Sequence, residues 1–275
     1  MAIDTPGTPE REPLLLAELS SPETAGLLPG IELVLVPVGA HEQHGPNIAV
    51  STDTVSADAL CRAAAGILGP RVAVAPAVPW GVSWHHLRFP GTIALRPATL
   101  IAVLEDVVAS LAAHGVQRFL VVNGHGGNNA AIATAVEQIK HETGVPLVAA
   151  VFGYALIVEQ AAALLPPAAI GHAGADEAAL VMAVAPHLAK PAAFSPAETT
   201  GAQAESAALL RAYGGVLARP YHEVTRNGAT GDATSATAEV GQQILDGAAR
   251  RLAEIVEVLL RESRDGGEGS EAAGR

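Results

Sequence analysis

The sequence predicts an α/β fold, a three-layer αβα arrangement in which helices cover both faces of a mainly parallel central sheet. Four short runs are apolar at consecutive positions, and a turn or loop and then a helical pattern follow each run. Strands that are apolar on both faces are typical of buried parallel sheets. The four runs are residues 32–39, 71–78, 117–124 and 145–153.

Helical spacing of apolar residues marks the segments between these strands. Residues 54–68, 97–115 and 128–144 are each predicted to be helical. Residues 190–235, which are rich in Pro, Gly, Ser and Thr, are predicted to form a long irregular segment, and such segments in compact domains tend to be functional. A final helix over residues 235–261 is expected to complete the core.

Length and composition indicate one domain. Of the 275 residues, 49% are hydrophobic and 16% are charged, which is enough apolar material for one large core. We expect a single domain over residues 14–262. Residues 1–13 and 263–275 are expected to be disordered, because both ends are polar and rich in Gly, Pro or charge.

Charge and hydropathy narrow the range of partners. A net charge of −12 argues against nucleic acid, because phosphate binding needs a basic surface. Charged residues interrupt the start of the chain where a signal peptide would be apolar, and no later apolar stretch reaches about 18 residues. We therefore expect a cytoplasmic protein that does not contact membranes. Its single cysteine, Cys61, excludes an internal disulfide and is expected to pack in the core.

The first group of chemically active residues follows the first predicted strand. Glu42 and His44 lie two residues apart, so an extended chain directs both side chains to the same side. Asp53 follows nine residues after His44 and can return a second carboxylate to the same edge. In parallel sheets, ligands bind at the carboxyl ends of the strands. The alternative for this segment alone is a solvated polar turn.

The second group is the turn at residues 123–129, where His125 follows another predicted strand. Its glycines resemble a dinucleotide-binding pattern, but Asn129 stands in place of the third glycine. The next strand also ends without the acidic residue that a ribose would need. We therefore expect the glycines to let the backbone approach a ligand while His125 reaches the first group.

The third group is His172 and Glu177, which flank the start of a predicted helix. A helix N-terminus favours a carboxylate or an oxyanion, although an acid in the first turn is often only structural. Together the three groups supply two imidazoles and three carboxylates, a set suited to zinc, manganese or ferrous iron. These candidate metal ligands are Glu42, His44, Asp53, His125 and Glu177.

Charge balance favours two metal ions at this predicted site. The positive charge of two divalent ions is balanced by the three carboxylates and one hydroxide, whereas one ion would leave the cluster anionic. Two ions about 3.5 Å apart share a bridging ligand in many hydrolytic sites. Asp53 is the natural candidate for that bridge.

Five motifs in this order resemble the creatininase family over about residues 14–260. The resemblance implies a parallel αβα fold, a binuclear metal centre and a homo-oligomer, often a hexamer. The family includes creatinine amidohydrolase, a formamide hydrolase of a pyrimidine pathway and a peptidase that trims the mycofactocin precursor. The motifs lie within residues 39–53, 81–92, 123–128, 172–177 and 231–237.

Carried over residue by residue, the resemblance makes Glu42, His44, Asp53 and His125 metal ligands and His172 a proton donor. Creatininase itself has a glutamate where this chain has Gly127, which argues against creatinine as the substrate and makes Glu177 the candidate replacement ligand. His86 is at the family's usual histidine position, beside His85. Residues expected to bind substrate or support the ligands are His86, Ser83, Asn123, Gly126 and Asn128.

The predicted activity is hydrolysis of an amide C–N bond, other than a peptide bond, in a small cyclic or linear substrate. A hydroxide that bridges the two metal ions would attack the carbonyl carbon, and His172 would protonate the leaving nitrogen. Two alternatives stay open at this point. One is a peptidase of the mycofactocin-precursor type, which acts on a short peptide, and the other is a metal-bound family member without catalytic activity.

Overall fold

A five-stranded parallel sheet forms the centre of the molecule. The computed structural model describes the chain over residues 12–272, with side-chain surroundings described to Ser263. The strand order is β1-β3-β2-β4-β5, and every neighbouring pair is parallel. The strands are β1 (Leu14–Leu15), β2 (Leu33–Val38), β3 (Val72–Val74), β4 (Arg118–Asn123) and β5 (Leu147–Phe152).

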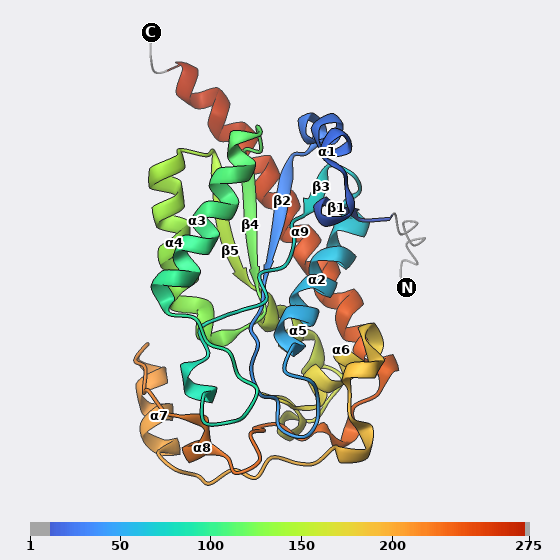
Figure 1. The fold of residues 1–275 in the computed structure, drawn as a ribbon, viewed down its shortest axis with the longest axis vertical. Helices are drawn as coiled ribbons and strands as arrows, with labels where there is room; N and C mark the ends of the chain where they lie inside the picture. Colours follow the sequence, from blue (N-terminus) through green and yellow to red (C-terminus); the bar gives the residue numbers. More distant parts are fainter. Residues whose placement is uncertain (1–11, 273–275) are drawn as a thin grey trace, which may run out of the picture.

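Helices cover both faces of this sheet, as Figure 1 shows. Alternate residues of β2 face opposite layers: Leu33 and Leu35 pack with α2, α5, α6 and α9, while Val34 and Val36 pack with α3 and α4. The three-layer αβα prediction is therefore confirmed. The helices are α1 (Ser21–Leu27), α2 (Thr52–Leu68), α3 (Pro97–Ala113), α4 (Asn129–Thr143), α5 (Gly153–Ala161), α6 (Ala175–Val184), α7 (Ala204–Ala212), α8 (Tyr221–Val224) and α9 (Ala238–Ala272).

The strand order creates a crevice at the carboxyl ends of β2 and β4. These two strands pair directly, with Val38 in register with Asn123. After β2 the chain enters α2 on one face of the sheet, and after β4 it enters α4 on the other face. Because the two connections diverge, the space between them is open to a ligand, as at the switch points of other open α/β sheets.

The connecting segments gather beyond this edge of the sheet. Figure 1 shows α7 and α8 at the same end of the molecule, far from the end of α9. The segment predicted to be irregular, residues 190–235, contains these two short helices within otherwise irregular chain. Cys61 is fully buried in the layer that contains α2, as predicted. None of the helices in the described part of the chain is long and apolar enough to cross a membrane.

The last helix differs from the prediction. The sequence predicts that this helix ends at Arg261 and that disorder begins at residue 263, but the backbone of α9 stays helical to Ala272. A helix satisfies its own backbone hydrogen bonds, so it can continue beyond Leu260, the last buried residue among the side chains described up to Ser263. The other expected disordered residues, 1–11 and 273–275, lie outside the described residues.

Removing residues 264–275 should leave the melting temperature unchanged. The shortened chain keeps Leu260 in the core and keeps the hydrogen bond from Arg118 Nε to Ser263 Oγ, 2.8 Å long. Thermal unfolding monitored by circular dichroism measures the effect. A matched chain that ends at Arg251 also loses Leu252 and Val256 and should not fold, because each buried leucine alone contributes about 2–5 kcal/mol. A drop of several degrees after the shorter deletion would contradict the prediction.

Candidate metal centre

The loops at the crevice bring the predicted ligands into one buried cluster. Glu42 and His44 follow β2, His125 follows β4, and Asp53 is in the first turn of α2. All four side chains are almost fully buried. Gly124 permits this approach, because a Cβ atom there would lie 2.5 Å from the backbone oxygen of Asp53. A side chain at that position would therefore push α2 away from β4.

Asp53 lies at the middle of the cluster and faces two imidazoles. Its Oδ1 atom is 3.2 Å from His44 Nε2, and its Oδ2 atom is 3.1 Å from His125 Nδ1. The two oxygens of one carboxylate thus point at two different candidate ligands. This is the geometry that a carboxylate needs in order to bridge two metal ions.

Backbone carbonyls hold the two imidazoles in orientation. His44 Nδ1 is 3.0 Å from the backbone oxygen of Glu42, and His125 Nε2 is 3.1 Å from that of Val82. A protonated ring nitrogen that donates to a carbonyl leaves the other nitrogen of a neutral ring unprotonated. His44 Nε2 and His125 Nδ1 are then the free nitrogens, and both face Asp53. Metal-binding histidines commonly have this second hydrogen bond.

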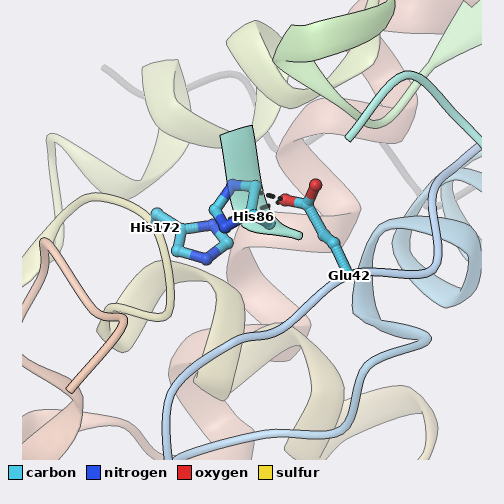
Figure 2. A group of neighbouring side chains, drawn as sticks. All are labelled: Glu42, His86 and His172. Carbon is cyan, nitrogen blue, oxygen red and sulfur yellow. Dashed lines mark ion pairs between the residues drawn. The ribbon is translucent and has the colours of Figure 1, made fainter. Parts of the chain in front are cut away.

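Glu42 joins this cluster to two further histidines. Figure 2 shows its carboxylate directed toward His86 and His172. Glu42 Oε1 lies 3.3 Å from His86 Nε2 and 3.7 Å from His172 Nδ1, while its other oxygen is 3.3 Å from His125 Nε2. His172 Nε2 lies 2.8 Å from the backbone oxygen of Gln43, so its Nδ1 atom faces the centre.

Glu177 reaches the cluster from the first turn of α6. Its Oε2 atom accepts a hydrogen bond of 2.6 Å from the backbone N–H of Ala173, and it lies 3.6 Å from His44 Nε2. Ala173, which donates this hydrogen bond, has a φ of 56°, which is uncommon for a residue other than glycine. The short distance between Glu177 and His44 places Glu177 on the side of the centre that contains His44.

The electrostatics of the cluster indicate a site that needs positive charge. Burial opposes ionisation of His44, but the carboxylates of Asp53 and Glu177 raise the pKa of His44 to about 10. Burial likewise opposes ionisation of His125, yet Glu42 and Asp53 raise its pKa well above the usual value. Burial raises the pKa of Glu177 to about 8. Buried carboxylates thus hold protons on their neighbours, because isolated buried charge is unfavourable.

Three buried atoms of the cluster form no regular hydrogen bond among the described residues and face only other candidate ligands: Glu42 Oε2, His44 Nε2 and Asp53 Oδ2. Buried polar atoms are normally paired, so three such atoms in one cluster point to a missing ligand. Nitrogen and oxygen donors of this kind suit zinc, manganese or ferrous iron. Within the described part of the chain, four sets of three residues could each hold a metal ion, because one donor atom from each residue lies within 4.8 Å of the other two. These sets are Glu42 with His44 and Asp53, His44 with His172 and Glu177, Glu42 with His86 and His172, and Glu42 with His85 and His125.

The asparagines of the second motif support the backbone around this centre. Asn128 Nδ2 donates to the backbone oxygen of Gly39 at 3.0 Å, and Asn128 Oδ1 accepts from the N–H of Val82 at 2.8 Å. Asn123 Nδ2 donates to the backbone oxygen of His125 at 2.7 Å. These bonds tie together the loops that follow β2, β3 and β4. Both asparagines are buried, so their contacts fit the supporting role among those expected from sequence.

Two other predicted residues also lie at the site. Ser83 Oγ is buried and lies 3.3 Å from His125 Nε2, where it contacts a candidate ligand. Gly126 lines a cavity of about 450 Å³ next to the cluster. Other residues that line this cavity are His85, His86, Phe152, His172 and Tyr221.

Gln43 lies at the candidate site, although the sequence pattern did not single it out. Its Nε2 atom is 2.8 Å from His86 Nδ1 and 3.0 Å from the backbone oxygen of Gly228, so the side chain joins two distant segments. An amide that donates to His86 Nδ1 leaves the hydrogen of that ring on Nε2, which faces Glu42. Gln43 is between two predicted ligands, but no chemical pattern singles out an amide at that position.

Tyr221 and Asp176 were also missed. Tyr221, on α8, packs its ring 4.0 Å from the ring of His86 and 5.0 Å from that of His172. Asp176 accepts a hydrogen bond of 2.8 Å from the hydroxyl of Tyr154 and one of 3.1 Å from the N–H of Gly171. The only sequence signal for Tyr221 was its place in the long irregular segment. Asp176 had none beyond its proximity to His172.

The fold and this cluster define an α/β protein with a candidate metal centre at the switch point of its sheet. The family model for creatininase (creatinine amidohydrolase) matches residues 17–256. The chain therefore belongs to the creatininase family, which is a family of hydrolases.

Individual relatives agree with this assignment. The chain is 33% identical over 223 residues to the mycofactocin precursor peptide peptidase of Mycolicibacterium smegmatis. That alignment covers 78% of this chain and 80% of the peptidase. The chain is also 31% identical over 115 residues to the creatinine amidohydrolase of Pseudomonas putida, and this alignment covers 40% of this chain and 44% of the amidohydrolase. A solved structure of manganese creatininase superposes with a TM-score of 0.77 at 23% identity, over 90% of this chain and 99% of the other, which supports the fold.

Metal binding to the ion-free protein should release protons at pH 7. His44, with a pKa of about 10, and Glu177, with a pKa of about 8, hold protons that a bound ion must displace. Because these pKa values are raised, the apparent affinity should increase as pH rises from 6 toward about 8. Calorimetric titration with Zn²⁺ in two buffers of different ionisation enthalpy measures the number released. A heat that is independent of the buffer would contradict the prediction, and Glu177→Gln should release fewer protons.

Proposed function

We propose that this chain is a metal-dependent hydrolase that cleaves an amide C–N bond in a short peptide or linear amide. The observation that carries the proposal is the position of Asp53, whose two oxygens face His44 and His125. A buried carboxylate between two imidazoles, beside a cavity, is a suitable arrangement for a hydrolytic metal centre.

We further propose that the centre holds two divalent ions, with zinc, manganese and ferrous iron as the candidates. Asp53 would bridge them. His44 and Glu177 would hold the ion on the Oδ1 side, and Glu42 and His125 the ion on the Oδ2 side. When bound, such ions polarise a substrate carbonyl and lower the pKa of a water molecule.

His172 is proposed to move the proton during the reaction. Its Nε2 hydrogen is directed at the backbone oxygen of Gln43, so its Nδ1 atom is directed at the centre. Burial, reinforced by the nearby His44 ring, lowers the pKa of His172 to about 3, so the ring starts neutral. Nδ1 can then accept a proton from the attacking water as a C–O bond forms. As the C–N bond breaks, the same atom returns that proton to the leaving nitrogen.

His86 and Tyr221 are proposed to shape the cavity around the reacting bond. His86 Nε2 faces Glu42 Oε1 at 3.3 Å, which positions that carboxylate. The ring of Tyr221 covers His86 and His172 and excludes water from one side of the cavity. Low water content strengthens the electrostatic interactions on which the chemistry depends.

The size of the cavity supports the choice of substrate. A volume of about 450 Å³ is in the range that holds ligands larger than a small cyclic amide. The peptidase relative aligns over most of this chain, whereas the creatinine amidohydrolase aligns over 40% of it. A short peptide therefore fits better than creatinine. The cytoplasmic location and the homo-oligomer, with a hexamer as the form implied by the resemblance, stay predictions.

The test is a comparison of purified, metal-loaded protein on a set of short peptides, linear amides and creatinine. We expect hydrolysis of at least one peptide or linear amide, with a kcat/KM well above that for creatinine, and loss of the activity after chelation. Mass spectrometry of the products identifies the bond that is cleaved. Two bound ions without hydrolysis of any substrate would instead favour a non-catalytic family member.

Replacing Asp53 with alanine should remove both metal ions and the activity. The substitution takes away the carboxylate that faces both imidazoles, so both sites lose a ligand at once. Metal content measured by mass spectrometry gives the result directly. Asp58→Ala is the matched control on α2, since Asp58 pairs with Arg62 away from the centre, and it should keep both ions. Two ions in Asp53→Ala would show that Asp53 does not bridge.

Replacing His172 with alanine should separate metal content from turnover. If Nδ1 transfers the proton and does not bind metal, His172→Ala keeps both ions and loses about 10²- to 10⁴-fold in kcat. Metal analysis and kinetics on the same preparation measure the two effects. Loss of an ion in proportion to the loss of activity would make His172 a metal ligand. Its position allows this role, because His44, His172 and Glu177 form one of the sets that could hold an ion.

A further inference from the structure

Apart from Asp53, each side of the centre has one carboxylate and one imidazole close to it. Glu177 and His44 lie on the Oδ1 side, and Glu42 and His125 lie on the Oδ2 side. Gly127, in the short helix Gly126–Asn128 that follows His125, has no side chain to add to the Oδ2 side. We propose that His85 is a further protein ligand on this side, in addition to Glu42, His125 and Asp53. This inference rests on the proposed metal-dependent function.

The positions of the three side chains support this assignment. Donor atoms of Glu42, His85 and His125 all lie within 4.8 Å of one another, close enough for one ion to contact each of them. Glu42 Oε2 is buried, forms no regular hydrogen bond among the described residues and faces His125 Nε2 at 3.3 Å. A carboxylate oxygen in that state needs a cation or a donor, and His85 is on the same side as His125.

The ring of His85 is free to bind a metal ion. Neither of its nitrogens makes a hydrogen bond to any part of the chain that the structure describes. The ring is half-buried and stacks on His125, with centroids 5.6 Å apart and an angle of 11° between the planes. His86, the next residue, is instead held by Gln43 and Glu42. The two adjacent histidines therefore serve different sides of the centre.

Gly127 makes room for this arrangement. A Cβ atom at this position would lie 2.9 Å from His85 Cε1, 2.4 Å from His125 Nε2 and 2.3 Å from the backbone oxygen of Val82. Any side chain there would push His85 away from His125. The observed position of the His85 ring therefore requires glycine at residue 127, because a side chain there would occupy space next to that ring.

A histidine ligand also agrees with the charge of the centre. Glu42, Asp53 and Glu177 already provide three negative charges if all are ionised by bound metal. Two divalent ions and one hydroxide balance these three carboxylates without a further anion. A neutral imidazole adds a donor and leaves the net charge unchanged, whereas a fourth carboxylate would make the buried centre anionic.

The experiment measures metal binding to ion-free wild-type protein and to His85→Ala, by metal analysis and by calorimetric titration with Zn²⁺. We expect two ions in the wild type. We expect His85→Ala to keep one ion and to bind the second at least about 100-fold more weakly, because even residues that only support ligands cost about 10- to 100-fold. Trp84→Ala is the matched control, an exposed neighbour on the same short helix (Trp84–His86), and should bind two ions as the wild type does.

A second variant distinguishes a ligand from a structural residue. His85→Glu should restore binding of the second ion through an oxygen donor. The visible absorption spectrum of the Co²⁺-loaded variant should then differ from that of the wild type, because one nitrogen ligand has become oxygen. This spectrum decides the question even if His85→Ala does not fold.

Two results would contradict the inference. Wild-type affinity for two ions in His85→Ala, or an unchanged Co²⁺ spectrum in His85→Glu, would show that His85 does not bind the metal and would favour a contact with substrate. These outcomes leave the proposed hydrolase intact. A wild-type chain that binds fewer than two ions would instead contradict the two-ion centre on which the proposed function itself depends.

Discussion

Asp53 is the residue on which the rest of the centre depends, because it places one buried carboxylate between two imidazoles. Its oxygens face His44 Nε2 at 3.2 Å and His125 Nδ1 at 3.1 Å. Without positive charge, three buried carboxylates at one point would be strongly unfavourable. The carboxylates raise the pKa of His44 and of His125, which favours protonated rings in the ion-free chain, and metal ions would replace those protons.

The scaffold holds this charged cluster through neutral hydrogen bonds. Asn128 joins Gly39 to Val82, and Val82 in turn provides the carbonyl that orients His125. Gln43 performs a comparable function for His86. Ligands that are oriented before metal binds need less rearrangement when it does. The precision of the centre therefore depends on amides that have no chemical role of their own.

Two sides of the centre are built differently. Glu177 lies on the Oδ1 side, in the first turn of α6, where the helix N-terminus favours a carboxylate. Glu42 and His125 lie on the Oδ2 side, with His85 next to the space that Gly127 leaves open. Such variation in ligands on a shared fold is one way in which a family changes metal preference or substrate while it keeps its architecture.

Most of the fold, and the proximity of the main residues of the candidate site, could be predicted from sequence, because both depend on local patterns. Apolar runs and helical spacing determined four of the five strands and the layers, and the spacing of Glu42, His44 and Asp53 placed them at one edge of the sheet. Only the tertiary structure decided which partner each side chain faces. Gln43 and Tyr221 came into view only through contacts between segments far apart in the chain, and the backbone of α9 continues to Ala272. Local periodicity carries no information about such long-range contacts, which depend on how the loops pack together.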